Sequence, residues 1–166
     1  MQKIARFEHI SQDQFENDYA QKIGGSAPAV DGVTLPKRAT AGSAGYDFFA
    51  PCDFILEAGK TITVPTGVRC SMENGWVLQI FPRSSLGFKF RLQLDNTVGI
   101  IDSDYYFAKN QGHIMIKITN NSKENKTVEI KAGEAFAQGV FIPFGITVDD
   151  NATEQRTGGF GSTTSK

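Results

Sequence analysis

The chain of 166 residues has only two cysteines and two histidines, and no long apolar run interrupts its charged residues. Cys52 and Cys70 lack the close spacing of a metal site, so reduced thiols in an intracellular protein are favoured over a disulfide. His9 and His113 lack the partner spacing of a zinc site or a Ser-His-Asp triad, and we interpret both as structural. No stretch approaches the roughly 20 apolar residues of a membrane span. Residues 1–25 have no apolar signal-peptide core, so a soluble cytoplasmic protein is expected.

The chain also lacks an excess of either charge, because its formal net charge is −1. This balance excludes the broad basic surface of a nucleic-acid-binding protein and the acidic excess of a disordered one. If the ligand is a polyanion, a local cluster of donors must bind it. The length suits one domain with a real core, and the 40% of hydrophobic residues is ordinary for a globular protein.

Thirteen phenylalanines and seventeen glycines, with short alternating runs between turn signals, indicate an all-β fold. We expect about ten short strands in a distorted jelly roll or β-barrel, with at most two helical pieces. The expected strands include residues 3–8, 46–51, 54–56, 61–64, 68–72, 76–81, 91–94, 114–118, 127–130 and 135–144. Asn74 and Gly75 predict a hairpin turn between two of these strands, since this pair favours positive φ.

One helix is expected at the N-terminus, over residues 11–22. Ser11 and Gln14 have capping-box spacing, and apolar residues recur at intervals of four from Phe15. Such a stripe is typical of a helix packed on a neighbouring surface. We therefore divide the chain into an N-terminal extension (1–34), a β domain (35–150) and a glycine-rich C-terminal arm (151–166).

The stretch Asn96–Tyr106 is a short apolar strand that ends in aspartates and tyrosines. Apolar flanks limit the solvation of Asp102, so its charge can act on a bound substrate. A solvated, Asp-rich turn is the alternative and, for the stretch alone, the more common arrangement. A calcium loop is excluded, because Tyr106 and Phe107 occupy positions where that loop needs a ligand and a glycine.

Two other stretches have the composition of anion-binding loops. Residues 82–87 combine an arginine, two serines and a glycine where a strand breaks. This composition is compatible with a phosphate cradle and equally with a simple Ser N-cap of a helix. Residues 156–164 combine an arginine, three glycines and hydroxyl groups with Phe160, which could stack on a base. A disordered tail is the alternative. The Gly-Lys-Ser/Thr ending of a Walker loop is missing.

These pieces occur in a recognisable order. Five motifs resemble those of the trimeric deoxyuridine triphosphatases (dUTPases): residues 41–47, 82–87, 96–105, 133–138 and 156–163. The resemblance covers about residues 35–163. It implies hydrolysis of dUTP to dUMP and pyrophosphate with Mg²⁺, which limits uracil incorporation into DNA and supplies dUMP for dTMP synthesis. It also implies a homotrimer with active sites between subunits, each closed by a C-terminal arm.

The resemblance further implies a role for each matching residue. Asp102 would be the general base that orients the water attacking the α-phosphorus. Tyr105 would lie against the deoxyribose and exclude a 2′-hydroxyl. The residues implied to read the uracil edge are Asn96 and, through main-chain groups, Ile100, Ile101 and Met115. A pocket that satisfies uracil leaves groups unpaired when cytosine enters, and so can discriminate strongly.

The remaining implied residues concern the phosphates and the metal. The phosphates would be held by Arg83, Ser84, Ser85 and Gln138. Asp47 would assist through Mg²⁺-bound water, with the ion held mainly by the triphosphate. In the arm, the γ-phosphate clamp and base stack would involve Arg156, Phe160, Gly161, Ser162 and Thr163.

The chain departs from the family pattern at four places. Tyr106–Asn110 is an insertion, Ala135 replaces a usual arginine, the arm motif is one residue shorter, and the N-terminal helix has no counterpart in the core family. A dCTP deaminase or bifunctional deaminase–dUTPase of the same fold is an alternative, although no glutamate lies in a matching motif. Another is a phage-type, nucleotide-gated regulatory protein, with the helix and the insertion as surfaces for a protein partner.

Overall fold

A computed structural model describes residues 2–154, which form a mostly β structure with two α-helices and two 3₁₀ helices. The elements are β1 (Ala5–His9), α1 (Gln12–Lys22), η1 (Val30–Gly32), β2 (Lys37–Arg38), β3 (Tyr46–Phe49), β4 (Phe54–Leu56), β5 (Thr61–Pro65), β6 (Val68–Met72), β7 (Trp76–Pro82), α2 (Ser84–Phe90), β8 (Leu92–Leu94), β9 (Gly99–Ile101), η2 (Ser103–Phe107), β10 (Met115–Asn120), β11 (Val128–Ile130) and β12 (Ala135–Pro143). The predicted all-β class is confirmed. None of the helices within residues 2–154 has the length and apolarity that crossing a bilayer requires.

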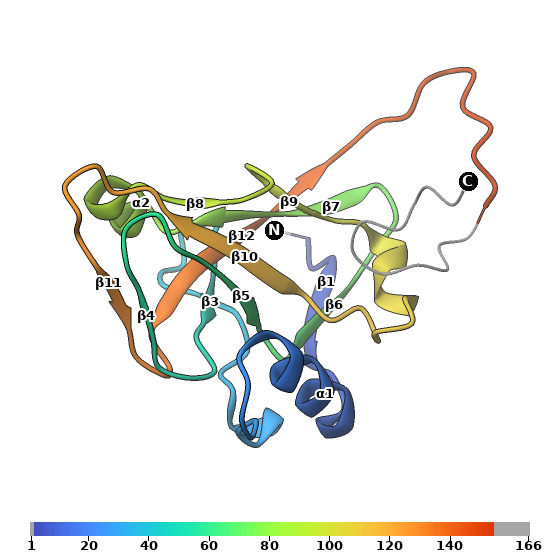
Figure 1. Ribbon diagram of the computed structural model, residues 1–166. Helices are drawn as coiled ribbons and strands as arrows, with labels where there is room; N and C mark the ends of the chain where they lie inside the picture. Colours follow the sequence, from blue (N-terminus) through green and yellow to red (C-terminus); the bar gives the residue numbers. More distant parts are fainter. Residues whose placement is uncertain (1, 155–166) are drawn as a thin grey trace.

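The strands form one large sheet and three small ones around a common core. The large sheet has the order β2-β3-β12-β7-β9, and a second sheet has the order β5-β10-β8. Two further pairs, β1-β6 and β11-β4, complete the walls. Figure 1 shows the sheets wrapped around the core as a distorted barrel, with α2 at one end and α1 below.

The core follows the alternation seen in the sequence. Along β10, the side chains of Ile116 and Ile118 are buried while Lys117 between them is exposed. Phe48 and Phe136 from the large sheet are fully buried in the same cluster. Burial of each such side chain contributes about 1.5–3 kcal/mol, so this cluster supplies the main stabilisation.

The connection at residues 73–75 differs from the prediction. Gly75 has the expected positive φ of 83°, but the turn does not close a hairpin. β6 pairs with β1, whereas β7 lies between β12 and β9 in the large sheet. The Asn-Gly signal therefore located the turn correctly and the strand partner incorrectly, because it reports local backbone shape alone.

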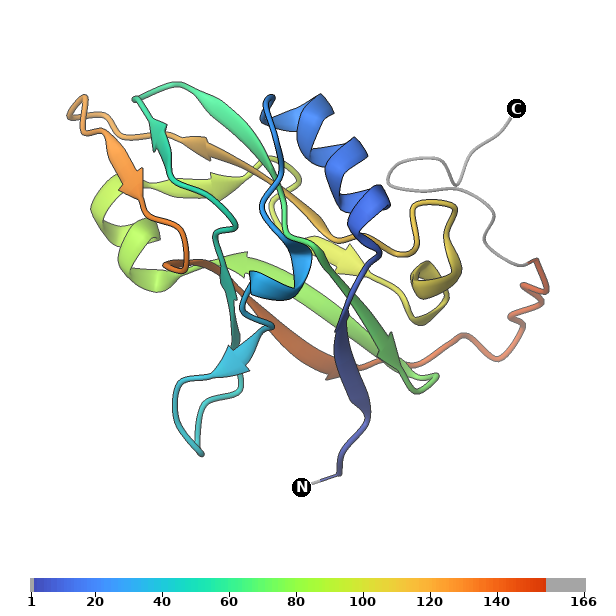
Figure 2. The same ribbon diagram turned by 90° about the horizontal axis from the view of Figure 1, so that it is seen from below.

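The N-terminal helix packs on the outside of the barrel against β5 (Figure 2). Ser11 is its N-cap and accepts a hydrogen bond from the Gln14 amide at 3.3 Å, as predicted. Phe15 and Tyr19 are buried in a small second core. The helix is thus an integral layer of the folded protein. Both cysteines are free thiols.

Candidate active site

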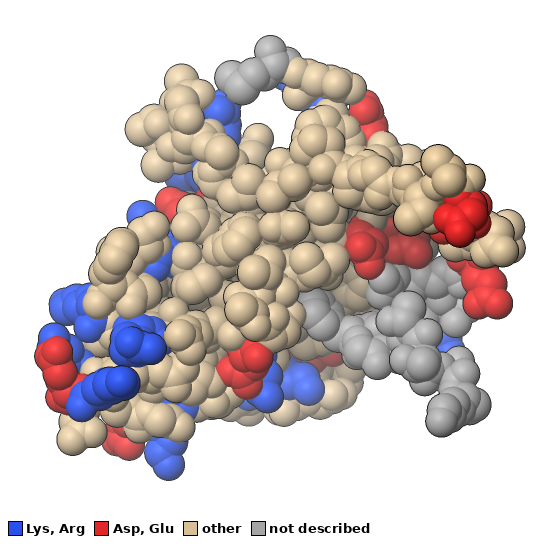
Figure 3. Space-filling model, turned by 90° about the horizontal axis from the view of Figure 1, so that it is seen from above, with Lys and Arg blue, Asp and Glu red and all other residues tan. Residues whose placement is uncertain are grey.

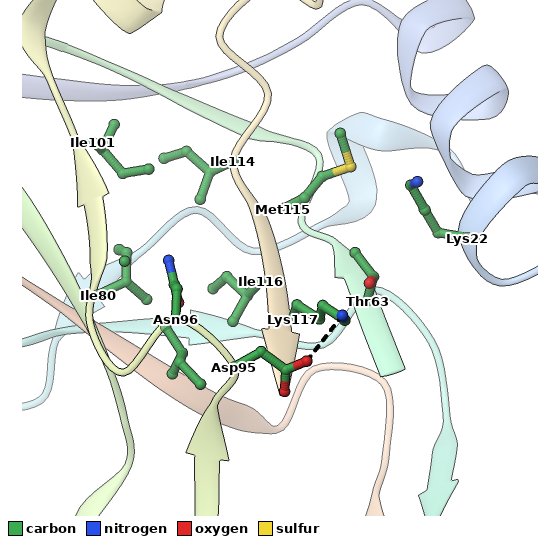
Figure 4. A pocket seen from close by; sticks show the side chains of 12 residues that line it. Lys22, Thr63, Ile80, Asp95, Asn96, Ile101, Ile114, Met115, Ile116 and Lys117 are labelled. Carbon is green, nitrogen blue, oxygen red and sulfur yellow. Dashed lines mark ion pairs between the residues drawn. The ribbon is translucent and has the colours of Figure 1, made fainter. Parts of the chain in front are cut away.

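A pocket of about 270 Å³ lies between β9 and β10 (Figure 4). Asn96, Ile101 and Met115, three of the residues expected to read a base, all line it. Drug-sized ligands occupy sites of roughly 300–1,000 Å³, so this smaller pocket suits a single planar ring. The structure therefore brings together residues that are up to nineteen positions apart in the sequence.

Strand edges supply the main-chain groups of this pocket. β9 is the last strand of its sheet and hydrogen-bonds to β7 on one side. Within β10, only Ile118–Asn120 pair with β8, so the stretch before it has no partner strand on that side among the described residues. Figure 4 shows the two strands facing each other across the pocket. Unpaired strand edges carry rows of N–H and C=O groups, which can match the donors and acceptors of a base.

Ile100 differs from the other expected base-reading residues. Its side chain is 50% exposed and is absent from the pocket lining. Neighbouring side chains of a strand point to opposite faces, so Ile101 enters the core while Ile100 faces outward. Any contribution from Ile100 comes through its main chain, as the sequence analysis expected.

Asp102 follows β9 directly and is the N-cap residue of η2. Its carbonyl oxygen accepts a hydrogen bond from the Tyr105 amide at 3.1 Å. Tyr105 is buried, with 3% of its surface exposed, and its hydroxyl donates to the His113 carbonyl oxygen at 2.8 Å. Asp102 thus directly follows Ile101, which lines the pocket, while the Tyr105 side chain is buried.

A second group of expected site residues lies at the far end of β7. Arg83 Nε is 3.2 Å from Asp47 Oδ1. Gln138 donates to the Pro82 carbonyl oxygen at 3.2 Å and lies opposite Asp47 in the β12–β3 register. Ser84 and Ser85 are exposed at the start of α2. An arginine has five N–H donors, so the contact with Asp47 leaves donors for an anion.

The two groups stand at opposite ends of the large sheet. Ile101 pairs with Leu78 in antiparallel register, which places Asp102 level with Val77, six residues before Arg83. Six residues of strand span roughly 20 Å. In Figure 1, α2 and the yellow η2 segment lie at opposite ends of the molecule. In Figure 3, basic side chains gather at one end of the face seen from above and acidic ones toward the other. One chain therefore cannot apply Asp102 and Arg83 to the same short ligand.

The arm residues expected to close the site, Arg156, Phe160, Gly161, Ser162 and Thr163, lie outside the described residues 2–154. Nine other described residues line the pocket, none of them expected as a site residue, and the polar ones among them are Lys22, Thr63, Asp95 and Lys117. Asp95 forms an ion pair with Lys117 at 3.0 Å. A hydrogen bond from the Thr119 hydroxyl is the main cause that lowers the pKa of Asp95, and Lys117 also lowers it. Lys22 reaches the pocket from α1, and no local pattern relates it to β9.

Among the described residues, Asp47 is the expected metal-binding residue. Within residues 2–154, no three His, Cys, Asp or Glu side chains gather to hold an ion. Asp47 places a single carboxylate at the phosphate-side group. Mg²⁺ in phosphate-processing sites is bound by one or two carboxylates, by substrate phosphates and by water. This donor set fits an ion that arrives on a polyphosphate.

Comparisons of the sequence with known proteins all match dUTPases. The family model described as dUTPase matches residues 31–164. The chain is 43% identical over 135 residues to the deoxyuridine 5′-triphosphate nucleotidohydrolase of Lactococcus lactis subsp. lactis (strain IL1403), covering 80% of this chain and 89% of that protein. It is 40% identical over 149 residues to the protein of the same name from Pasteurella multocida (strain Pm70), covering 85% and 90%.

Solved structures of dUTPases are similar in fold to this chain. The crystal structure of a dUTPase from Streptococcus mutans has a TM-score of 0.66 at 39% identity, covering 87% of this chain and 98% of that one. A mutant dUTPase from phage phi11 of S. aureus, at 20% identity and a TM-score of 0.64, shares the fold, with coverage of 92% and 98%.

Proposed function

This chain belongs to the dUTPase family and is a deoxyuridine 5′-triphosphate nucleotidohydrolase, and we propose how its own residues carry out that reaction. The observation that supports the mechanism is the pocket between two strand edges, whose lining residue Ile101 is followed directly by Asp102. Uracil occupies the pocket, where the Asn96 side chain and main-chain groups of β9 and Met115 pair with its edge. Cytosine reverses the donor and acceptor at N3 and at the group on C4, and so leaves buried groups unpaired, which costs binding energy.

Asp102 is the general base of the proposed mechanism. Its carboxylate orients a water molecule and accepts a proton from it while the water oxygen bonds to the α-phosphorus. The bond from the α-phosphorus to the bridging oxygen breaks, and its electron pair leaves with pyrophosphate. Tyr105 lies under the sugar and leaves no room for a 2′-hydroxyl. General-base catalysis of this kind contributes typically 10²–10⁴-fold in rate.

The phosphates bind at the second group of residues. Arg83, Ser84, Ser85 and Gln138 donate hydrogen bonds to the triphosphate and stabilise the charge on the leaving pyrophosphate. Asp47 holds a water of the substrate-borne Mg²⁺. When bound, the ion neutralises phosphate charge and aligns the phosphate chain. Arg156, Ser162 and Thr163 clamp the γ-phosphate and Phe160 stacks on the base, with Gly161 between them.

The distance between the two groups supports an active site shared between subunits. Asp102 must reach the α-phosphorus and Arg83 must reach the neighbouring phosphates of the same triphosphate. Because the two residues of one chain stand roughly 20 Å apart along β7, they serve different substrate molecules. A homotrimer, in which each site combines residues of several chains, meets this requirement. The cytoplasmic location expected from the sequence stays a prediction.

The pocket also bears on the deaminase alternative. Deamination of a cytosine ring needs a glutamate poised at the base, and no glutamate is among the pocket-lining residues in the described part of the chain. Nothing in the pocket therefore favours a second activity on dCTP. The regulatory-protein alternative concerns the N-terminal helix and the insertion, and stays a prediction.

Pyrophosphate release measured over all deoxynucleoside triphosphates tests this proposal. We expect turnover of dUTP alone, and ammonia release from dCTP would contradict the pocket assignment. Asp102→Asn is expected to bind dUTP with unchanged affinity and to lose about two orders of magnitude or more in kcat. Near-normal turnover by Asp102→Asn would show that another group activates the water.

A further inference from the structure

The N-terminal helix and the insertion Tyr106–Asn110, two segments without an assigned role, are joined by hydrogen bonds at or next to their ends. The Ser11 amide donates to Gln111 Oε1 at 2.9 Å, and Gln111 Nε2 donates to Ser11 Oγ at 2.8 Å. Gln111 thus occupies the place that a capping box would give to Gln14. The Tyr106 hydroxyl donates to Glu8 at 2.7 Å. Figure 2 shows α1 beside the yellow segment that carries η2.

The innermost of these contacts is a buried pair. Asp18 of α1 accepts a hydrogen bond from His113 Nδ1 at 2.6 Å. His113 is fully buried and Asp18 is 6% exposed. Gln14 Nε2 donates to the same Asp18 oxygen at 2.9 Å. A carboxylate in this setting is well defined in position, because two donors share one of its oxygens.

The protonation of the His113 ring follows from its second contact. The Gly67 amide donates to His113 Nε2 at 2.9 Å, so this nitrogen carries the lone pair. A neutral imidazole then has its single proton on Nδ1, facing Asp18. Burial lowers the pKa of His113, against the opposing effect of Asp18, which agrees with a neutral ring. Both ring nitrogens are therefore satisfied in one orientation only.

From His113 the hydrogen bonds continue to the residues of the active site. The His113 carbonyl oxygen accepts from the Tyr105 hydroxyl at 2.8 Å. Asn110 Nδ2, from the insertion, donates to the same hydroxyl at 2.8 Å. The Tyr105 amide in turn donates to the Asp102 carbonyl oxygen at 3.1 Å. An unbroken chain of contacts thus runs from α1 to Asp102.

We propose that Asp18 and His113 are positioning residues of the active site, which hold the segment Asp102–Tyr105 in its working place. The proposal rests on the proposed function, since it assigns these residues to the same site. Docking a helix does not by itself call for such a pair. Burial of a carboxylate costs several kcal/mol, and well-packed apolar residues serve stability as well or better. A buried hydrogen-bonded chain instead specifies one arrangement.

The test compares Asp18→Ala with Asp18→Asn, using kcat, KM and the preference for dUTP over UTP. Asp18→Ala leaves the Nδ1 proton of His113 without its acceptor, so the segment shifts and kcat is expected to fall about 10- to 100-fold. KM should change less than about twofold, because β9 and β10, which carry the base-reading groups, are held by pairing with β7 and β5. The ratio of kcat/KM for dUTP to that for UTP should fall about tenfold as Tyr105 moves. Asp18→Asn keeps an acceptor oxygen and should restore all three quantities.

Val33→Ala is the matched control for lost stability. Val33 is buried in the same small core as Phe15 and Tyr19, and it takes part in none of the hydrogen bonds that link Asp18 to Tyr105. It should lower the urea midpoint and leave kcat and the dUTP preference unchanged. If Asp18→Ala does not fold, Asn110→Ala removes a donor to the Tyr105 hydroxyl from the insertion side and should lower kcat and the dUTP preference in the same way.

The proposal is overturned if Asp18→Ala has the kcat and dUTP preference of Val33→Ala, or if Asp18→Asn is no better than Asp18→Ala. A wild-type protein that releases no pyrophosphate from dUTP would instead refute the proposed function. Nitrogen-15 NMR of the two histidines gives a readout independent of activity. We expect a slowly exchanging Nδ1–H signal from His113 that persists in Asp18→Asn and disappears in Asp18→Ala, with His9→Gln assigning the other ring.

Discussion

At the scale of single residues, Asp18 and Asp102 show how position decides what a carboxylate does. Asp18 is buried and its oxygen is occupied by His113 and Gln14. Asp102 is partly exposed and follows a pocket-lining residue, so it can meet a ligand. The same chemical group is a fixed acceptor in one place and the proposed base in the other, because solvent access and partners differ.

The neutral state of His113 predicts a pH effect on stability. Its folded-state pKa lies below the usual 6.5 because of burial, so below about pH 6.5 the unfolded chain takes up a proton that the folded protein does not. The free energy of unfolding should therefore fall as the pH decreases from 6.5 toward the folded-state pKa, by at most about 1.4 kcal/mol per pH unit from this group.

Urea unfolding at several pH values checks this effect. Between pH 7.5 and pH 5.5, the free energy of unfolding of His113→Gln should fall less than that of wild type. The difference in slope should correspond to about one proton taken up on unfolding. His9→Gln serves as the control and should keep the wild-type pH profile. An identical profile for wild type and His113→Gln would mean that the ring is protonated equally in both states.

At the scale of elements, the segment from η2 to β10 depends on an unusual turn. Gln111 and Gly112 both have positive φ, 60° and 71°. A left-handed conformation costs a non-glycine residue roughly 1–2 kcal/mol, and the two hydrogen bonds between Gln111 and Ser11 compensate it. A Cβ at Gly112 would lie 2.8 Å from the Tyr105 carbonyl oxygen. Glycine thus lets the chain fold back onto the segment that carries Tyr105.

Gly112→Ala should therefore impair both stability and activity. The positive φ and the contact with rigid backbone act together, and we expect a loss of about 2–4 kcal/mol. Displacement of Tyr105 should lower kcat at unchanged KM. Gly59→Ala is the control, because Gly59 has a φ of 77° and open space around it. It should lose about 1 kcal/mol and retain kcat, as judged by urea midpoints and initial rates.

At the scale of the whole molecule, the large sheet separates the two halves of the chemistry. Asp102 and Arg83 leave opposite ends of β9 and β7, which are antiparallel neighbours. Folding one chain cannot remove this separation, because hydrogen-bonded strands are rigid and their lengths are set by residue count. Association of chains, as we propose, would remove it, since a symmetric assembly can place the Arg83 end of one subunit beside the Asp102 end of another.

Subunit mixing tests whether the sites are shared. Asp102→Asn and Arg83→Ala are each expected to be nearly inactive alone. After unfolding and refolding together at equal amounts, random assembly should regenerate about a quarter of the wild-type sites, since each site draws the two residues from different chains. If the mixture shows only the averaged activity of its two components, each site lies within one chain. The readout is pyrophosphate release from dUTP.

The sequence alone determined most of the strands and the all-β class. Alternation along β10, the turn at Gly75 and the N-cap at Ser11 are local properties, so a few neighbouring residues encode them. The family resemblance also pointed to Asn96, Ile101 and Met115, which the structure places in one pocket, while their role in reading a base stays a prediction. Only the tertiary structure revealed the partner of β6, the entry of Lys22 into the pocket and the separation of Asp102 from Arg83. It also joined Asp18 to His113, residues 95 positions apart. Such contacts depend on how strands are ordered and paired, and no local spacing encodes that order.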